Sequence, residues 1–273
     1  MDWKRKYLSF LEVEEKAPTY GYLVELIQAH MQKVSFDLCS KIHYFLHQEE
    51  NGWLTPPIEV FVQNLYEKGF GGNCFILNPS FKQLVEALGY SVHLVRIPAG
   101  HVAMCVTIEN KQYYVDVGYS VPIFEPVKLG KNSSYHACGE DVYITKESEN
   151  SYIIDRHRNG ASFVKKTIDL TPIEMDDLAS DIADSYKDVN DNRFMRRVTA
   201  TVFKEGIAYS VANNILYVAS NKESKEYVFE RREDWMKMMK ETYSIKEKYI
   251  NDALAFLEDR GVHLFKQSCK NFG

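Results

Sequence analysis

The chain has 273 residues, of which 45% are hydrophobic and 26% are charged, and its formal net charge is −5 at pH 7. This composition is that of an ordinary globular protein, long enough for one large domain or two to three smaller ones. The acidic balance and the absence of a basic run argue against nucleic acid or an anionic membrane as a partner.

The cysteines and the apolar stretches indicate in which cellular compartment the protein is expected. The five cysteines are odd in number and scattered along the chain: Cys39, Cys74, Cys105, Cys138 and Cys269. This pattern favours reduced thiols over a disulfide framework, and no CxxC pair suggests zinc. The N-terminal residues 1–6 are charged, and no apolar stretch approaches the roughly 20 residues that span a bilayer. We therefore expect a cytoplasmic protein without a metal.

The first ninety residues carry helical patterns. Helices are predicted over Thr19–Val34, Thr55–Tyr66, Cys74–Leu77 and Asn78–Leu88. Pro79 is expected to separate the last two, because the residue before a proline is pushed away from helical geometry. His30 lies on the apolar stripe of the first helix, which favours a core histidine with a satisfied hydrogen bond over a catalytic one.

From residue 90 the hydrophobic period changes from 3.6 to 2. Strands are predicted over Ser91–Ile97, His101–Ile108, Tyr113–Gly118, Val142–Thr145, Tyr152–Asp155 and Ala161–Ile168. Short consecutive strands with polar turns indicate an antiparallel barrel or sandwich. A capping box at Thr171–Glu174, with a proline at the first helical position, predicts a helix that continues to about Tyr186.

A third group of elements closes the chain. Strands are predicted over Phe194–Phe203, Ile207–Ala212 and Ile215–Ser220, and helices over Glu233–Thr242 and Lys246–Arg260. Asn213-Asn214 is expected to form a hairpin turn. The expected organisation is therefore a helical part over residues 1–89, a β part over 90–190, and an α/β part over 191–273.

Three residues have the chemistry of covalent acyl transfer. Cys74 follows two glycines and opens a helical segment, where unpaired N–H groups and the helix dipole favour a thiolate. His101 begins one predicted strand, and Asp116 is embedded in another, where an unpaired carboxylate would be costly to bury. A nucleophile, a base and a carboxylate that orients the base form a catalytic triad.

Strand pairing can bring the histidine and the aspartate together. If Glu109-Asn110 is a two-residue turn, Asp116 lies opposite Ala103 and shares one face with His101, roughly 7–8 Å away at Cβ. A turn one residue later keeps the same face but increases the separation. The pattern therefore permits a triad. Each of the three residues, taken alone, could instead have a structural role without any part in catalysis.

The three segments resemble, in order and spacing, the catalytic motifs of arylamine N-acetyltransferases. The segments are Gly71-Gly72-Asn73-Cys74-Phe75, His101-Val102-Ala103-Met104 and Tyr114-Val115-Asp116-Val117-Gly118-Tyr119. The resemblance implies an α+β fold with an N-terminal helical bundle, a central antiparallel β-barrel and a C-terminal α/β lid, on a core like that of cysteine proteases and transglutaminases.

The resemblance also implies a reaction and a site. An acetyl group would pass from acetyl-CoA, as co-substrate, through a thioester on Cys74 to an aromatic amine or hydrazine, with His101 as base and Asp116 as the orienting carboxylate. Ala99, Gly100 and Tyr186 correspond loosely to positions that contact coenzyme A in the family. No metal, nucleic acid or membrane is implied.

The chain departs from the family pattern around the cysteine. The family usually has arginine where this chain has Phe70, an aromatic residue in place of Asn73, and an acidic or amide residue in place of Ile76. An arginine–carboxylate pair that supports the loop therefore cannot form in its usual way. Two alternatives to an acetyltransferase remain. One is a transglutaminase-like cysteine hydrolase that needs no coenzyme A, and the other is a non-catalytic member of the fold.

Overall fold

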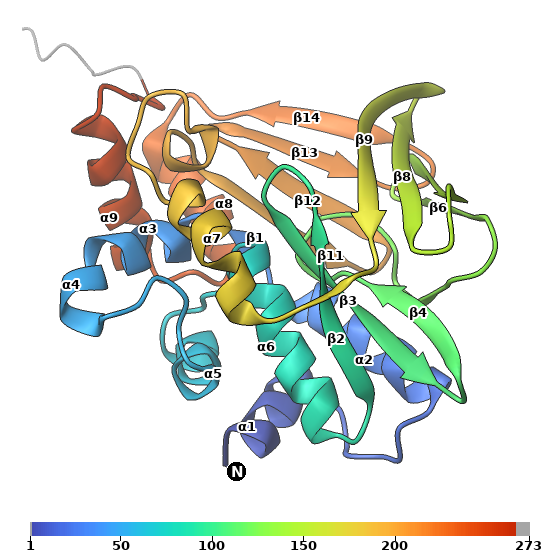
Figure 1. The fold of residues 1–273 in the computed structure, drawn as a ribbon. Helices are drawn as coiled ribbons and strands as arrows, with labels where there is room; N and C mark the ends of the chain where they lie inside the picture. The colour runs from blue at the N-terminus through green and yellow to red at the C-terminus, as the bar shows by residue number, and fades with distance from the viewer. Residues whose placement is uncertain (1, 266–273) are drawn as a thin grey trace, which may run out of the picture.

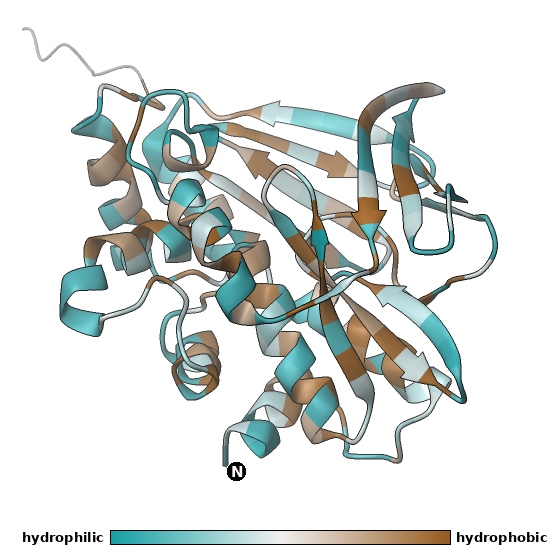
Figure 2. Cartoon of the chain, in the orientation of Figure 1, coloured by the Kyte–Doolittle hydropathy of each residue, from teal (hydrophilic) through white to brown (hydrophobic). Residues whose placement is uncertain are grey.

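Helices dominate the N-terminal third of the chain in a computed structural model that describes residues 2–265. They are α1 (Asp2–Leu11), α2 (Tyr20–Lys33), α3 (Cys39–Leu46), α4 (Gln48–Asn51), α5 (Ile58–Glu67) and α6 (Cys74–Ala87). Figure 1 shows α6 running beside β2 and β3, while α1 and α5 lie at the base of the molecule. The apolar sides of these helices, brown in Figure 2, build a core continuous with that of the C-terminal helices.

The predicted break at Pro79 is wrong, because α6 continues through this residue. Asn78 and Pro79 are both buried, and the Asn78 side chain makes hydrogen bonds to the neighbouring strands. A proline in a helix removes one hydrogen bond, here the one to the carbonyl of Phe75. The tertiary contacts of Asn78 offset this loss, so the helix stays intact.

The strands form three antiparallel sheets in the described part of the chain. The first contains β1 (Phe36–Asp37), β11 (Thr199–Lys204), β12 (Ile207–Ala212), β13 (Ile215–Ala219) and β14 (Ser224–Val228). The second contains β10 (Pro172–Ile173), β2 (Ser91–Ile97), β3 (His101–Ile108), β4 (Lys111–Val115) and β5 (Val127–Lys128). The third contains β6 (Ser133–Ala137), β7 (Glu140–Lys146), β8 (Ser151–Arg158) and β9 (Ala161–Asp169).

The mixed helix and sheet content is as predicted, but no closed barrel is found within residues 2–265. The second sheet ends in the two-residue strands β5 and β10, and the strands of the third sheet pair only with one another. The very short edge strands of the second sheet limit its further pairing. None of the helices in the described residues is long and apolar enough to cross a membrane.

The helix predicted over Thr171–Tyr186 is shorter than expected. The Thr171 hydroxyl donates a hydrogen bond to Asp169 instead of capping a helix, and Pro172-Ile173 pairs with β2 as β10. The capping box lies three residues later, between Glu174 and Asp177, and opens a 3₁₀ turn that leads into α7 (Ala179–Ser185).

The C-terminal elements return to the N-terminal helices. A 3₁₀ turn (Arg193–Met195) precedes β11, and α8 (Arg232–Tyr243) and α9 (Glu247–Glu258) follow the first sheet. β11 pairs with β1 from the helical part, and α9 packs on α3. The N- and C-terminal thirds of the chain thus share one sheet and one helical core.

Candidate active site

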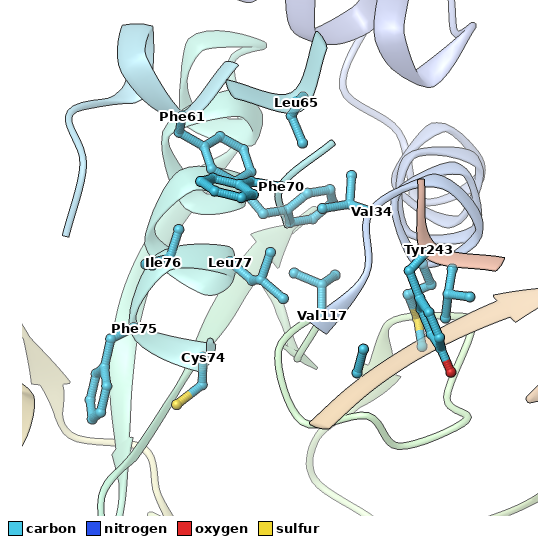
Figure 3. Packing of buried hydrophobic residues seen from close by; sticks show 14 of the residues in the cluster. Val34, Phe61, Leu65, Phe70, Cys74, Phe75, Ile76, Leu77, Val117 and Tyr243 are labelled. Carbon is cyan, nitrogen blue, oxygen red and sulfur yellow. The ribbon is translucent and has the colours of Figure 1, made fainter. Parts of the chain in front are cut away.

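Cys74 is the first residue of α6, and the loop before it runs close to β1. Gly72 pairs with Phe36, and a Cβ on Gly71 would lie 1.7 Å from the carbonyl oxygen of Ser35. A Cβ on Gly72 would lie 2.7 Å from the Cβ of Ile76. Only glycine fits at these two positions, so the loop packs closely against the backbone of Ser35 and the side chain of Ile76. Figure 3 shows Cys74 at the start of the helix, with Leu77 and Val117 nearby.

The loop is supported without an arginine–carboxylate pair. The buried Asp37 accepts a hydrogen bond from the backbone N–H of Gly71 at 2.9 Å and another from Ser40 at 2.6 Å. Phe70 stands where the family has arginine, and its ring packs against Tyr249 with centroids 4.8 Å apart. Hydrogen bonding by Asp37 and aromatic packing by Phe70 therefore replace the ion pair.

His101 and Asp116 are hydrogen-bonded directly, and the strand register is the one that was predicted to permit this contact. Ile108 pairs with Lys111, so Glu109-Asn110 is the turn, and both turn residues have positive φ. His101 Nε2 lies 2.7 Å from Oδ2 of Asp116. Because a carboxylate only accepts, Nε2–H is the donor, and Nδ1 remains for the thiol.

Asp116 is buried and fully hydrogen-bonded. Oδ2 also accepts from the Tyr114 hydroxyl at 2.8 Å, and Oδ1 accepts from Asn78 Nδ2 and the Gly118 N–H, both at 2.9 Å. These bonds satisfy all four acceptor positions of an ionised carboxylate. The arrangement holds Asp116 in place as an anion that can orient His101.

The electrostatics of the pair favour the charged forms of both residues. Burial by itself would lower the pKa of His101, but the negative charges of Asp116 and of the Cys74 thiolate raise it to about 10. Burial would raise the pKa of Asp116, but the charge of His101 and the hydrogen bonds hold it below its usual value. A neighbouring imidazolium favours the thiolate form of a cysteine, which is its nucleophilic form.

The residues expected to contact coenzyme A fall into two environments. Ala99 and Gly100 form an exposed turn with positive φ, and the Gly100 carbonyl lies 4.0 Å from the Cys74 sulfur. Tyr186 is 3% exposed, and its hydroxyl donates to the carbonyl of Leu54 at 3.0 Å. The turn therefore borders the nucleophile at the surface, whereas Tyr186 belongs to the interior.

Several residues of the site were not identified from the sequence. Asn78 lies one helical turn after Cys74, and this spacing alone could have indicated that it shares the same face of the helix. Tyr114 lies in β4, which ends at Val115 and not at the predicted Gly118, so Asp116 is the first residue after the strand. The two-residue spacing could have indicated that both side chains lie on one face. Lys41 is a lysine in an apolar helix, and it is buried near the site.

Tyr119 covers the histidine from the side of the third sheet. Its ring centroid is 4.7 Å from that of His101, and the Lys166 ammonium lies 5.1 Å from the Tyr119 ring centroid. The Arg156 guanidinium also lies over Tyr119, while it pairs with Glu140 at 2.7 Å. These three residues, Tyr119, Lys166 and Arg156, form a wall of the site that is aromatic next to the histidine and positively charged beyond it.

Comparisons with known proteins show which family the chain resembles. A family model described as N-acetyltransferase matches residues 20–250 of the chain. A Dictyostelium discoideum protein named "Probable arylamine N-acetyltransferase 2" is 26% identical over 109 residues. This match spans 34% of the chain and 36% of that relative.

Solved arylamine N-acetyltransferases share the fold. The enzyme of Bacillus cereus, which is described with a Cys-His-Glu triad, superposes with a TM-score of 0.73 and 19% identity over 90% of this chain and 99% of its own. The enzyme of Mycobacterium marinum in complex with CoA gives a TM-score of 0.79 and 15% identity over 96% of this chain and 99% of its own.

Proposed function

The chain belongs to the arylamine N-acetyltransferase family, and from this premise we propose that it transfers an acetyl group from acetyl-CoA through Cys74 to an aromatic amine or hydrazine. The observation that carries the proposal is the arrangement at the start of α6, where Cys74 lies beside a histidine bound to the carboxylate of Asp116. The likeness to a solved relative in complex with CoA supports the choice of donor.

The first half of the reaction forms a thioester on the enzyme. The Cys74 thiolate attacks the acetyl carbonyl carbon, and the new C–S bond forms as the bond to the sulfur of CoA breaks. The leaving thiolate takes the proton of the His101 imidazolium. Asp116 keeps the ring in orientation and favours its charged form before the transfer.

The second half returns the enzyme to its starting state. The amine nitrogen attacks the acetyl carbon, His101 accepts the proton from nitrogen, and the C–S bond breaks to regenerate the thiolate. One nucleophile serves both halves, so CoA leaves before the amine reacts. Cys74 is only 9% exposed, which limits the access of water to the thioester between the two steps.

We also propose which residues contact the donor and how the chain divides into domains. Ala99 and Gly100 are proposed to contact coenzyme A at the surface, next to the Cys74 sulfur. Tyr186 is buried, so a contact there would involve the end of acetyl-CoA that carries the acetyl thioester. We assign residues 1–89, 90–190 and 191–273 as the helical, β and lid domains, with the acceptor amine bound under the lid.

Intact-mass analysis after mixing with acetyl-CoA alone tests the proposal. The chain should gain one acetyl group, and peptide mapping should place it on Cys74. Cys74→Ala should gain none, while the matched variant Cys39→Ala should still be acetylated. Acetylation of Cys39, Cys105, Cys138 or Cys269 instead would contradict the assignment.

Steady-state kinetics test the order of the steps. Initial rates against acetyl-CoA at several amine concentrations should give parallel lines in a double-reciprocal plot. Intersecting lines would indicate a ternary complex and remove the thioester from the productive path. Rapid hydrolysis of acetyl-CoA that no amine alters would favour a hydrolase instead.

A further inference from the structure

Three polar side chains with unused hydrogen-bonding capacity gather beside Cys74, and they do not belong to the triad. Lys41 comes from α3, Asn73 precedes the nucleophile, and Tyr186 follows α7. We refer to these three residues as the polar cluster. Members of the family usually have an aromatic residue at the position of Asn73, so this chain differs from the family pattern within the polar cluster.

Lys41 carries a buried charge without a carboxylate partner among the described residues. The side chain is 1% exposed, and its ammonium donates one hydrogen bond, to the carbonyl of Ser185 at 2.6 Å. The rings of Tyr186 and Phe194 lie 4.8 and 5.5 Å from the ammonium. Burial lowers the pKa of Lys41 to about 8, and the Cys74 thiolate opposes this shift. A buried ammonium with two unused N–H groups is costly unless a ligand pairs with it.

Asn73 supplies the second unpaired group. The residue is 4% exposed, and neither its Oδ1 nor its Nδ2 has a hydrogen-bond partner within the described residues. It occupies the N-cap of α6, where an asparagine side chain ordinarily accepts a helix N–H, but here the side chain makes no such bond. Its amide lies close enough to the Tyr186 hydroxyl to oppose the rise in the pKa of Tyr186, but no hydrogen bond of normal geometry joins the two groups, and the hydroxyl donates to Leu54. The Asn73 side chain therefore faces the cluster and not the helix end.

The chemistry of the cluster selects an anion with more than one acceptor oxygen. A carboxylate can accept from an ammonium on one oxygen and from an amide N–H on the other, and charge-assisted hydrogen bonds of this kind are strong. On the proposed function, the group bound next to Cys74 is either the acyl chain or the acceptor amine. We propose that Lys41 and Asn73 bind a carboxylate carried by the substrate, so that the enzyme selects acidic substrates over neutral ones of the same shape.

Two matched pairs of substrates distinguish the sources of the carboxylate. The acceptor pair is 4-aminobenzoate and 4-aminobenzamide, used with acetyl-CoA. The donor pair is malonyl-CoA and acetoacetyl-CoA, used with aniline. The wild-type enzyme should prefer the charged member of one pair by at least about tenfold in kcat/KM, as expected for a charge-assisted hydrogen bond.

Lys41→Met tests the residue directly, because methionine fills a similar buried space without charge. This variant should reduce the preference in that pair to less than about threefold. Lys166→Met is the matched control. It removes another partly buried cation whose pKa the charge of Cys74 acts to raise, in this case one beside the Tyr119 ring, and it should keep the preference. Asn73→Leu should reduce the preference in the same pair as Lys41→Met, but by less.

Three results on the substrate preference would overturn the proposal. These are no preference in either pair, a preference that survives in folded Lys41→Met, and a preference lost in Lys166→Met. An equal loss for charged and neutral substrates in Lys41→Met would also contradict it, because the lysine would then act on the reaction and not on a carboxylate. Calorimetric binding of both amines to Cys74→Ala, with and without Lys41→Met, tests the cluster even if Cys74 is never acetylated.

Discussion

The side chain of Asn78 donates a hydrogen bond of 2.9 Å to Oδ1 of Asp116. The same amide donates to the carbonyl of Val102 at 2.6 Å and accepts from the N–H of Val117 at 2.9 Å. Asn78 lies one turn after Cys74, so a single side chain links the helix that carries the nucleophile to the strands that carry the base and the carboxylate.

Asn78→Ala should impair both the fold and the reaction. It leaves a buried carbonyl, a buried N–H and one acceptor position of Asp116 without a partner, and each such loss costs about 1–3 kcal/mol. We expect a fall of at least about 3 kcal/mol in the free energy of unfolding, measured with urea, and a slower acetylation of Cys74 in the protein that remains folded.

Asn64→Ala is the matched control for this variant. Asn64 is also a buried amide in a helix, α5, and it donates to the Tyr44 hydroxyl at 3.0 Å without a hydrogen bond to any residue of the triad. Its loss should lower stability without a matching loss of acetylation rate per folded molecule. Equal rate losses in both variants would mean that Asn78 has no particular role at the site.

Asp116→Asn should weaken the ion pair between His101 and Cys74. The negative charge of Asp116 contributes to the raised pKa of His101, about 10 in the intact site, and an amide cannot replace that charge. The midpoint of the pH profile for alkylation of Cys74 by iodoacetamide should therefore move to higher pH.

Tyr114→Phe should move the same profile in the same direction but by less, because it removes one hydrogen bond to the carboxylate and keeps its charge. An unchanged profile in Asp116→Asn would show that another group orients the histidine. A shift in Tyr114→Phe as large as that in Asp116→Asn would indicate that hydrogen bonding, and not charge, dominates.

Local pattern was sufficient to predict much of the architecture. The strands Ser91–Ile97 and His101–Ile108 have the predicted bounds, and the Glu109-Asn110 turn sets the predicted register of the triad. Alternation of apolar residues and turn chemistry are local properties, so one sequence reports them well. The two-residue turn at Asn213-Asn214 follows from the same reasoning.

The wrong predictions fall where contacts between residues distant in sequence determine the structure. Pro79 remains in a helix because Asn78 is fixed by residues 24 to 39 positions away. β1 was not predicted because its two residues are extended through pairing with β11 and with Gly72, both distant in sequence. His30 is in the core as expected, but the predicted hydrogen bond is wrong, because neither ring nitrogen has a partner in the described structure.

Gly118→Ala should disturb the site more than its size suggests. An added Cβ would lie 2.7 Å from Asn78 Nδ2 and 2.9 Å from the Cα of Cys74, so the loop after Asp116 must move away from α6. Overpacking of this kind costs about 1–3 kcal/mol, and the movement should lengthen the contact between His101 and the thiol. Thermal melting and the rate of acetylation by acetyl-CoA measure the two effects.

Gly21→Ala provides the control for this substitution. No atom lies within 4 Å of a Cβ added at Gly21, which is in α2 and has no positive φ. Alanine favours a helix over glycine, so this variant should be as stable as the wild type or more stable, with the same acetylation rate. If Gly118→Ala behaves in the same way, the close packing of the loop on Cys74 is not required for activity.

His30 should make the protein sensitive to acid. Complete burial lowers the pKa of His30 to about 3, whereas an ordinary histidine titrates near 6.5. The unfolded chain therefore binds a proton below pH 6.5 that the folded chain does not bind until about pH 3, and stability is lost as the pH falls through this window. At pH 5 this residue alone should lower the free energy of unfolding by about 2 kcal/mol relative to pH 8.

The buried carboxyl of Asp37 acts in the opposite direction, so the wild-type pH profile by itself is not sufficient. Burial raises the pKa of Asp37 from 3.8 to about 6, and its contribution to stability falls as the pH rises through that range. His30→Leu removes only the histidine and leaves an apolar side chain of similar size between Tyr7 and Phe81. In urea denaturation of both proteins, the stability of His30→Leu relative to the wild type should increase by about 2 kcal/mol from pH 8 to pH 5. A difference that stays constant with pH would show that His30 is protonated in the folded protein and has a partner there.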